Sequence, residues 1–364
     1  MTLTKCLSEI SDHRRAEGKR FNMIQMFSII FISGLCGHFG GRAVSRFAES
    51  HMEIFVNELS LKHGTPSHTK ISTFINAISE EKMIAVFHKW TSSYVVFDTE
   101  EGVSGDGKAL KSTRLDNRGK NFKAIVSFFS HKNGLVHSIS KYENEKKSEV
   151  NVVLALLDRL KDMGITLHLD ALHCQKKTIE KIVATGNDYV VQVKRNQKTL
   201  HEEIQRVIVE EEPIDTYEEH EKGHGRHSSW YVTVFDATNS KKVQEWERLT
   251  RMIHVHKKTV CTKTKKESHN DRFYISNKKC RHAIDFHRGI RGHWTIENSL
   301  HWVKDVVHKE DANQIRTNNG PINSAIISTI VINIHRKNGI RSITDSQIKF
   351  GANVKELFDF FFKQ

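Results

Sequence analysis

The feature that most constrains the fold is a change of hydrophobic period near residue 103, where helical spacing gives way to strand-like alternation. Residues 102–110, "GVSGDGKAL", predict a strand that ends at Asp106. Residues 122–142, "FKAIVSFFSHKNGLVHSISKY", alternate on both sides of the turn "HKNG" and therefore predict a β-hairpin. A sheet must therefore start here, after a long helical region.

After the hairpin, predicted helices and strands alternate along the chain. The segments are a helix over 149–164 ended by Gly164, a strand over 165–171, a helix over 175–186 ended by Gly186, and a strand over 188–194. Hairpin strands followed by this alternation predict an α/β fold with an RNase H-like mixed sheet and flanking helices.

The first 95 residues predict helices only. The apolar run 23–36 is interrupted by polar residues and is shorter than the roughly 20 residues that a membrane span needs, so we expect a buried helix. Ser67 and Ser79 are typical helix N-caps. Short helices with basic residues between them favour an N-terminal DNA-binding domain, and the alternative is a helical scaffold without DNA contacts.

The region from His201 to Asn277 is polar and rich in strand patterns, and it contains a linker-like stretch at 210–227. We expect a small β-rich subdomain inserted into the sheet. Helices return over 291–308, and over 321–337, where isoleucines recur every four residues. The expected organisation is an N-terminal helical domain (1–95), a catalytic core in two parts (96–200 and 286–340), the β-rich insertion (201–285) and a C-terminal tail (341–364) that docks on the body.

The charge balance points to an anionic partner. Lys and Arg total 56 against 43 Asp and Glu, which gives a formal charge of +13. Double-stranded DNA is the first candidate, because counterion release from the phosphate backbone rewards basic charge spread over a surface. A membrane is not expected, since the basic residues are not concentrated on one amphipathic helix. Five unpaired, widely spaced cysteines predict reduced thiols and a cytoplasmic protein.

Three carboxylates stand at places where an α/β fold can build a site. Asp106 lies between Gly105 and Gly107, which leave room for a ligand beside the backbone, and Asp170 closes the next strand. Glu297 lies on a predicted helix, beside an apolar stripe, and could be directed at the strand ends. The alternative for each aspartate alone is a turn or helix-cap residue.

Three oxygen ligands without sulfur favour Mg²⁺, with Mn²⁺ as a substitute, over zinc. The histidines do not show the Cys/His spacing of a zinc finger. Two divalent ions about 4 Å apart would activate a hydroxyl or water and stabilise the leaving oxygen in an in-line phosphoryl transfer. The cations would also offset the mutual repulsion of the acids.

Six ordered blocks resemble one known family. They are "DGKALKST", "LHLDALHCQKKTI", "DYVVQVKRNQ", "GHGRH", "RFYISN" and "HWTIENSLHWVKDVVHKEDANQIR". The chain resembles DDE insertion-sequence transposases of the kind that includes H-repeat-associated proteins, from about residue 11 to 336. The opening "DHRRAEGKRF" is similar to the N-terminal domain of that group.

The resemblance implies an RNase H-like core whose catalytic and metal-binding acids are Asp106, Asp170 and Glu297. It also implies that Lys304 contacts DNA, because it matches the lysine of a Tyr, Arg, Glu, Lys signature. Ile290 and His293 stand at the tyrosine and arginine positions of that signature.

Other residues are expected to contact DNA or to support the site. Lys108, Lys194 and Arg291 are candidate DNA contacts, and the lysines are alternatively solvated surface residues. His301 could orient a metal ligand, Trp294 could stack on a displaced base, and Glu149 could lie near the site. The alternative for the rings of His301 and Trp294 is ordinary packing against neighbouring residues.

These features together predict a prokaryotic transposase that cuts insertion-element ends and joins their 3′-hydroxyls to target DNA. It would act as a homodimer on the two ends, without a small-molecule cofactor. Two alternatives are an RNase H-like nuclease without strand transfer and a catalytically silent DNA-binding descendant.

Overall fold

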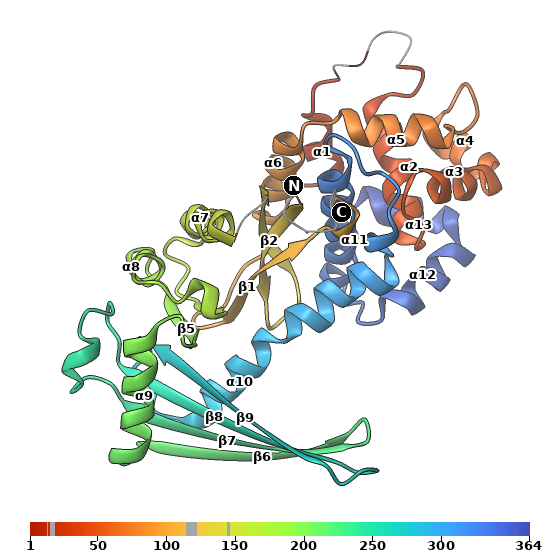
Figure 1. Ribbon diagram of the computed structural model, residues 1–364. Helices are drawn as coiled ribbons and strands as arrows, with labels where there is room; N and C mark the ends of the chain where they lie inside the picture. Colours follow the sequence, from red (N-terminus) through yellow and green to blue (C-terminus); the bar gives the residue numbers. More distant parts are fainter. Residues whose placement is uncertain (13, 15–18, 114–121, 144–145) are drawn as a thin grey trace. The chain divides into compact units, whose positions relative to one another are not determined.

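A computed structural model describes residues 1–12, 14, 19–113, 122–143 and 146–364, so part of the motif "DHRRAEGKRF" lies outside the described residues. The chain divides into two compact units (Figure 1). The first unit comprises Met1–Val96, Gly107–Val152 and Ile296–Gln364, and the second comprises Phe97–Asp106 and Val153–Thr295.

The first unit begins with short helices, as the sequence predicts. They are α1 (Leu3–Ser8), α2 (Met23–Leu35), α3 (Gly41–Ser50), α4 (Met52–Leu59), α5 (His68–Ala77) and α6 (Glu80–Thr91). Ser67 and Ser79 are confirmed as N-caps, because their side chains accept hydrogen bonds from the backbone N–H groups of Lys70 and Lys82. No helix among the described residues is both long enough and apolar enough to cross a membrane.

Long apolar helices form the core of this unit. The expected burial of α2 is confirmed from Met26 to Leu35. In α11 (Gly320–Lys337) the four periodic isoleucines are all fully buried: Ile322, Ile326, Ile330 and Ile334. The tail forms α12 (Ile343–Ala352) and α13 (Val354–Phe362), and the burial of Phe358 and Phe361 confirms that it docks on the body.

In the described part of the chain, nine strands form one mixed sheet in the order β3-β2-β1-β4-β5-β9-β8-β7-β6. The strands are β1 (Gly102–Ala109), β2 (Lys123–Ser130), β3 (Val136–Glu143), β4 (Thr166–Leu169), β5 (Asp188–Val193), β6 (Asp215–Gly223), β7 (Arg226–Asp236), β8 (Arg251–Cys261) and β9 (Glu267–Ser276). The predicted hairpin is β2–β3, and β4 runs parallel to both β1 and β5. Helix α7 (Lys146–Leu157) precedes β4, and α8 (Lys176–Ala184) connects β4 to β5. This mixed sheet with flanking helices confirms the predicted α/β class and fits an RNase H-like fold.

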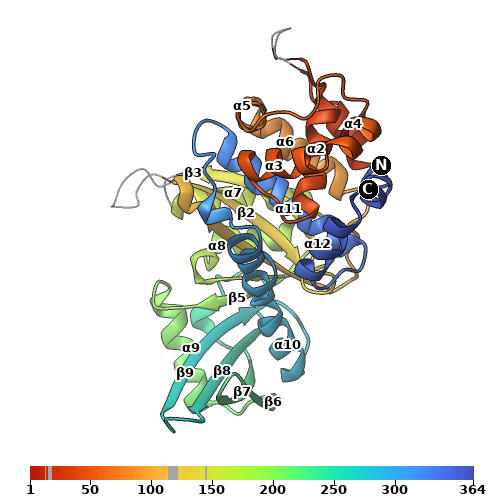
Figure 2. The same cartoon turned by 90° about the vertical axis from the view of Figure 1, so that its right-hand side faces the viewer.

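The polar region after β5 differs from its predicted form. It begins with helix α9 (Lys198–Glu210), and the stretch interpreted as a linker contains β6. Strands β6 to β9 continue the main sheet through the antiparallel pair β5–β9 (Figure 2). The linker interpretation was wrong because β6 is an exposed strand at the edge of the sheet. Charged side chains are favoured on an edge strand, since they prevent pairing with another chain, and they make its sequence polar.

The segment that carries Glu297 is also more complex than one helix. Helix α10 (Ala283–His293) lies in the second unit and packs on β6 and β7. Two π-helical segments, η6 (Glu297–His301) and η7 (Val303–Val307), follow in the first unit. The predicted apolar stripe is confirmed, because Ile296, Leu300 and Val303 are buried and Val307 packs against the same core.

Candidate active site

Asp106 lies within β1 and not at its end, which corrects the sequence prediction. The strand continues to Ala109, but its pairing with β4 stops one residue before Asp106, at Gly105 opposite Leu169. The two flanking glycines therefore mark the end of one pairing and not the end of the strand. Asp106 is half-buried and directly precedes Gly107, the first residue of this strand in the first unit.

Asp170 occupies the corresponding place on the neighbouring strand. It follows Leu169, the last residue of β4, and its carboxylate Oδ1 accepts a hydrogen bond from the backbone N–H of Leu172 at 2.9 Å. In the parallel register, Asp106 and Asp170 each come one residue after the last paired residues, Gly105 and Leu169.

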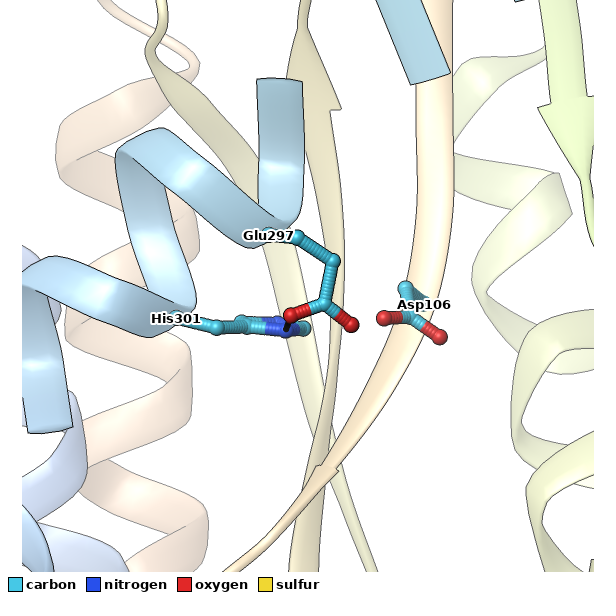
Figure 3. A group of neighbouring side chains, drawn as sticks. All are labelled: Asp106, Glu297 and His301. Atoms are coloured by element: carbon cyan, nitrogen blue, oxygen red, sulfur yellow. Dashed lines mark ion pairs between the residues drawn. The ribbon is translucent and has the colours of Figure 1, made fainter. Parts of the chain in front are cut away.

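Glu297 and His301 supply two further ligand atoms near Asp106. One atom of each of the three side chains lies within 4.8 Å of the others, and this is the one group of metal-ligand type among the described residues. Figure 3 shows the Glu297 carboxylate directed toward Asp106, with the imidazole of His301 beside it. His301 Nδ1 lies 3.4 Å from Glu297 Oε2, and Glu297 is 67% exposed whereas His301 is buried. Asp170 is not part of this group.

Lys108 and Lys304, which were expected to contact DNA, are buried in an ion-pair network of the first unit. Lys108 Nζ lies 2.6 Å from Asp305 Oδ1 and 3.5 Å from Glu310 Oε1. Lys304 is only 2% exposed, and its Nζ lies 3.2 Å from Glu310 Oε2. These pairs connect the end of β1 to the segment that carries Glu297.

Burial and pairing act in opposite directions on these two ammonium groups. Burial lowers the pKa of Lys108, but the Glu310 and Asp305 carboxylates outweigh it and raise this pKa above its ordinary value. Burial dominates at Lys304 and lowers its pKa, since Glu310 only partly compensates and the charge of Lys108 adds to the decrease. Lys304 is thus held in the protein interior by one principal acidic partner.

Glu149 lies against the backbone beside Asp106. Its carboxylate Oε2 accepts a hydrogen bond from the Tyr142 hydroxyl at 2.7 Å, and the residue is 8% exposed. A Cβ atom added at Gly107 would meet Glu149 Cδ at 2.7 Å and the Tyr142 hydroxyl at 2.8 Å. A side chain at position 107 would therefore require the Glu149 carboxyl group and the Tyr142 hydroxyl to shift.

A hollow of about 700 Å³ opens beside Asp170 within the second unit. Basic and aromatic side chains line it, including Lys194, Arg195, Arg272 and Trp294. Lys194 is exposed, and the Arg272 guanidinium lies 4.2 Å from the centre of the Trp294 ring, which is 41% exposed. Sequence reasoning assigned no role to Arg272, because its place beside Asp170 depends on the pairing of β9 with β5.

Arg291 is already engaged by other side chains of the second unit. Its guanidinium donates to Glu221 Oε2 at 2.7 Å and lies 4.9 Å from the centre of the Trp230 ring. The hydrogen bond to Glu221 raises the pKa of Arg291 above its ordinary value. A phosphate would have to compete with Glu221 for this guanidinium.

This arrangement is typical of DDE nucleic-acid enzymes: two acids lie on neighbouring parallel strands of a mixed sheet, and a later helical segment supplies a glutamate. The chain belongs to this class: residues 97–334 match the family described as "Transposase DDE domain", and residues 4–91 match its "DDE_Tnp_1-associated" domain. This confirms the resemblance seen in the sequence.

Named bacterial relatives agree with this assignment. The "H repeat-associated putative transposase YhhI" of Escherichia coli (strain K12) is 29% identical, over 92% of this chain and 91% of the relative. The "Putative transposase YncI" of Escherichia coli O157:H7 is 26% identical, over 92% and 87% respectively. The "H repeat-associated putative transposase YbfD" of the K12 strain is 28% identical, over 65% of this chain and 96% of the relative.

Proposed function

We propose that this transposase cuts DNA at the ends of an insertion element and joins the released 3′-hydroxyls to target DNA. In the first reaction, a water oxygen attacks a phosphodiester at the element end and the bond to the 3′ oxygen breaks. In the second, that 3′-hydroxyl attacks a target phosphodiester, so one P–O bond forms and one breaks. The grouping of Asp106 with Glu297, next to the strand edge that carries Asp170, supports this function.

The residues present fit a divalent metal centre. Asp106 and Glu297 offer carboxylate oxygens, His301 offers a nitrogen, and their ligand atoms are close enough to share one ion. Oxygen-rich ligand sets favour Mg²⁺ or Mn²⁺. When bound, two such ions would activate the attacking oxygen and stabilise the leaving one.

We assign the ligand roles to Asp106, Asp170 and Glu297. The exposed Glu297 requires orientation, because a mobile glutamate would lose side-chain entropy on binding an ion. His301 orients Glu297, because the imidazole is buried one turn away and its Nδ1 lies 3.4 Å from the Glu297 carboxylate. We therefore assign His301 a positioning role and Glu149 a supporting role through its contact with Gly107.

The hollow beside Asp170 is the part of the second unit best suited to hold a DNA strand next to the acids. Lys194, Arg195 and Arg272 line it, so its cations can neutralise backbone phosphates, and Trp294 offers an exposed ring for a base. Lys108, Lys304 and Arg291 are better explained as structural cations, because carboxylates already hold them. Two ends must be brought together for transposition, so we propose that a homodimer acts on DNA.

The test is to incubate the purified full chain and Mn²⁺ or Mg²⁺ with DNA that carries the borders of the element. We expect cut ends together with joined products on a denaturing gel. Cutting without joining would favour the nuclease alternative, and DNA retardation without cutting would favour the silent descendant.

A substitution separates binding from chemistry. Asp170→Asn should abolish cutting but leave DNA retardation unchanged, because the amide keeps the size of the side chain and removes its charge. An exposed carboxylate outside the site, Asp359→Asn, is the matched control and should cut normally. Cutting that survives in Asp170→Asn contradicts the assignment.

A further inference from the structure

A second hollow, of about 750 Å³, lies entirely within the first unit. Its walls come from the loop between α2 and α3, the start of α3, helix α5, the segment 308–317 and helix α11. None of its lining residues is among the proposed metal ligands. Its volume falls in the range of pockets that bind small molecules.

Four exposed cations line this hollow: Arg42, Arg46, Lys309 and Arg316. Within the described ranges, no carboxylate oxygen lies within 4.0 Å of their charged groups. The acid Glu310 also lines the hollow, but the buried Lys108 and Lys304 already pair with it. The cations therefore face the hollow without a compensating anion.

The first turn of α3 adds partial positive charge at the same place. Its N-cap is Gly40, with φ of 78°, and no side chain caps the helix. The first backbone N–H groups of a helix have no partner inside the helix, and the aligned peptide dipoles favour an anion beside them. Gly40, Gly41 and Arg42 all line the hollow.

Unsatisfied polar atoms in the wall independently indicate a ligand. His308 is 3% exposed, and its Nδ1 lies 2.7 Å from the Ser328 hydroxyl, but its Nε2 has no hydrogen-bond partner in the described part of the chain. The Ser324 hydroxyl and the Asn76 Oδ1 are likewise buried atoms without a partner there. Such groups cost free energy unless a bound group or water satisfies them.

We propose that this hollow binds backbone phosphates of DNA, which makes it a DNA contact of the first unit outside the metal site. This inference rests on the proposed function, in which DNA is the substrate. A phosphodiester suits the hollow because its anionic oxygens accept hydrogen bonds from arginines and from backbone N–H groups.

Salt-dependent binding to a random-sequence duplex tests the proposal, measured by fluorescence anisotropy with the full chain. Each phosphate contact contributes about 0.9 to the slope of log K against log salt concentration. The double variant Arg42→Gln/Arg316→Gln should therefore lower the slope by about 2. The matched control Arg341→Gln, an exposed arginine of the same unit outside the hollow, should lower it by less than half of one contact's share. Equal slopes for Arg42→Gln/Arg316→Gln and the unmodified protein would overturn the proposal.

A variant without a charge change distinguishes the hollow from a general basic surface. Ala312 is exposed and lines the hollow, whereas Ala352 is exposed and lies elsewhere in the same unit. Ala312→Trp should weaken DNA binding at least tenfold by filling the space, and Ala352→Trp should not. Equal affinities of the two variants would refute the proposal.

Cutting by these variants separates this inference from the proposed function. If the unmodified protein cuts DNA and Ala312→Trp binds it normally, the inference fails and the proposed function stands. If no cutting occurs but the salt slope falls as expected, the DNA contact stands and the catalytic proposal fails.

Discussion

Replacing Lys304 with methionine decides whether this lysine contacts DNA or stabilises the fold. Its Nζ is buried 3.2 Å from Glu310 Oε2, so in Lys304→Met the one cation of the described residues left to neutralise this buried carboxylate is Lys108, at 3.5 Å. Removing one partner of a buried ion pair costs roughly 3–5 kcal/mol, and the remaining lysine places the expected loss near 3 kcal/mol. In a chain of this size, such a loss corresponds to a decrease in Tm of several degrees.

Thermal unfolding followed by circular dichroism measures the loss, and anisotropy at several salt concentrations measures DNA binding. Lys355→Met, at an exposed lysine of the same unit, is the control and should leave Tm unchanged. The double variant Lys304→Met/Glu310→Gln should recover part of the Tm, since it removes the uncompensated charge. An unchanged Tm for Lys304→Met, with a salt slope reduced by about 1, would show instead that Lys304 reaches a phosphate.

Three further variants test other parts of the structure. Gly107→Ala should lower the stability by about 1–3 kcal/mol and slow DNA cutting, measured by urea unfolding and by gel, because its Cβ would overlap the Glu149 carboxyl group; unchanged stability would contradict this packing. His301→Gln should raise the Mn²⁺ concentration required for cutting at unchanged DNA affinity, since it removes the imidazole beside Glu297; an unchanged metal requirement would exclude the positioning role. Burial lowers the pKa of His335 from 6.5 to about 4, so the unfolded chain binds a proton first as the pH falls, and stability should decrease from pH 6.5 to about 4 by up to roughly 3 kcal/mol. His335→Phe should remove that part of the pH dependence, and an identical pH profile of unfolding would argue against it.

Local patterns predicted the elements well where most residues of the element are buried. The hairpin β2–β3 and the isoleucine helix α11 appear as expected, because alternation and four-residue spacing follow directly from burial. The same logic failed for β6, whose residues face solvent at the sheet edge and so lack an apolar pattern. It also gave the wrong end for β1, because Gly105 and Gly107 resemble a strand end although the strand continues to Ala109.

Residues of the candidate site were predictable where their position follows a local pattern, and not where it depends on long-range packing. Asp106 and Asp170 follow strand patterns, and Glu297 follows the face of its helix beside the apolar stripe, with the family resemblance in agreement. A lysine near a catalytic acid, however, looks the same in sequence whether it faces a phosphate or a buried carboxylate. Lys108 and Lys304 differ from Lys194 because the fold brings Glu310 to both of them and Asp305 to Lys108, and burying a cation without such a partner would be too costly. We therefore expect the proposed DNA contacts to come from cations that no carboxylate of the described residues pairs with, such as those lining the two hollows.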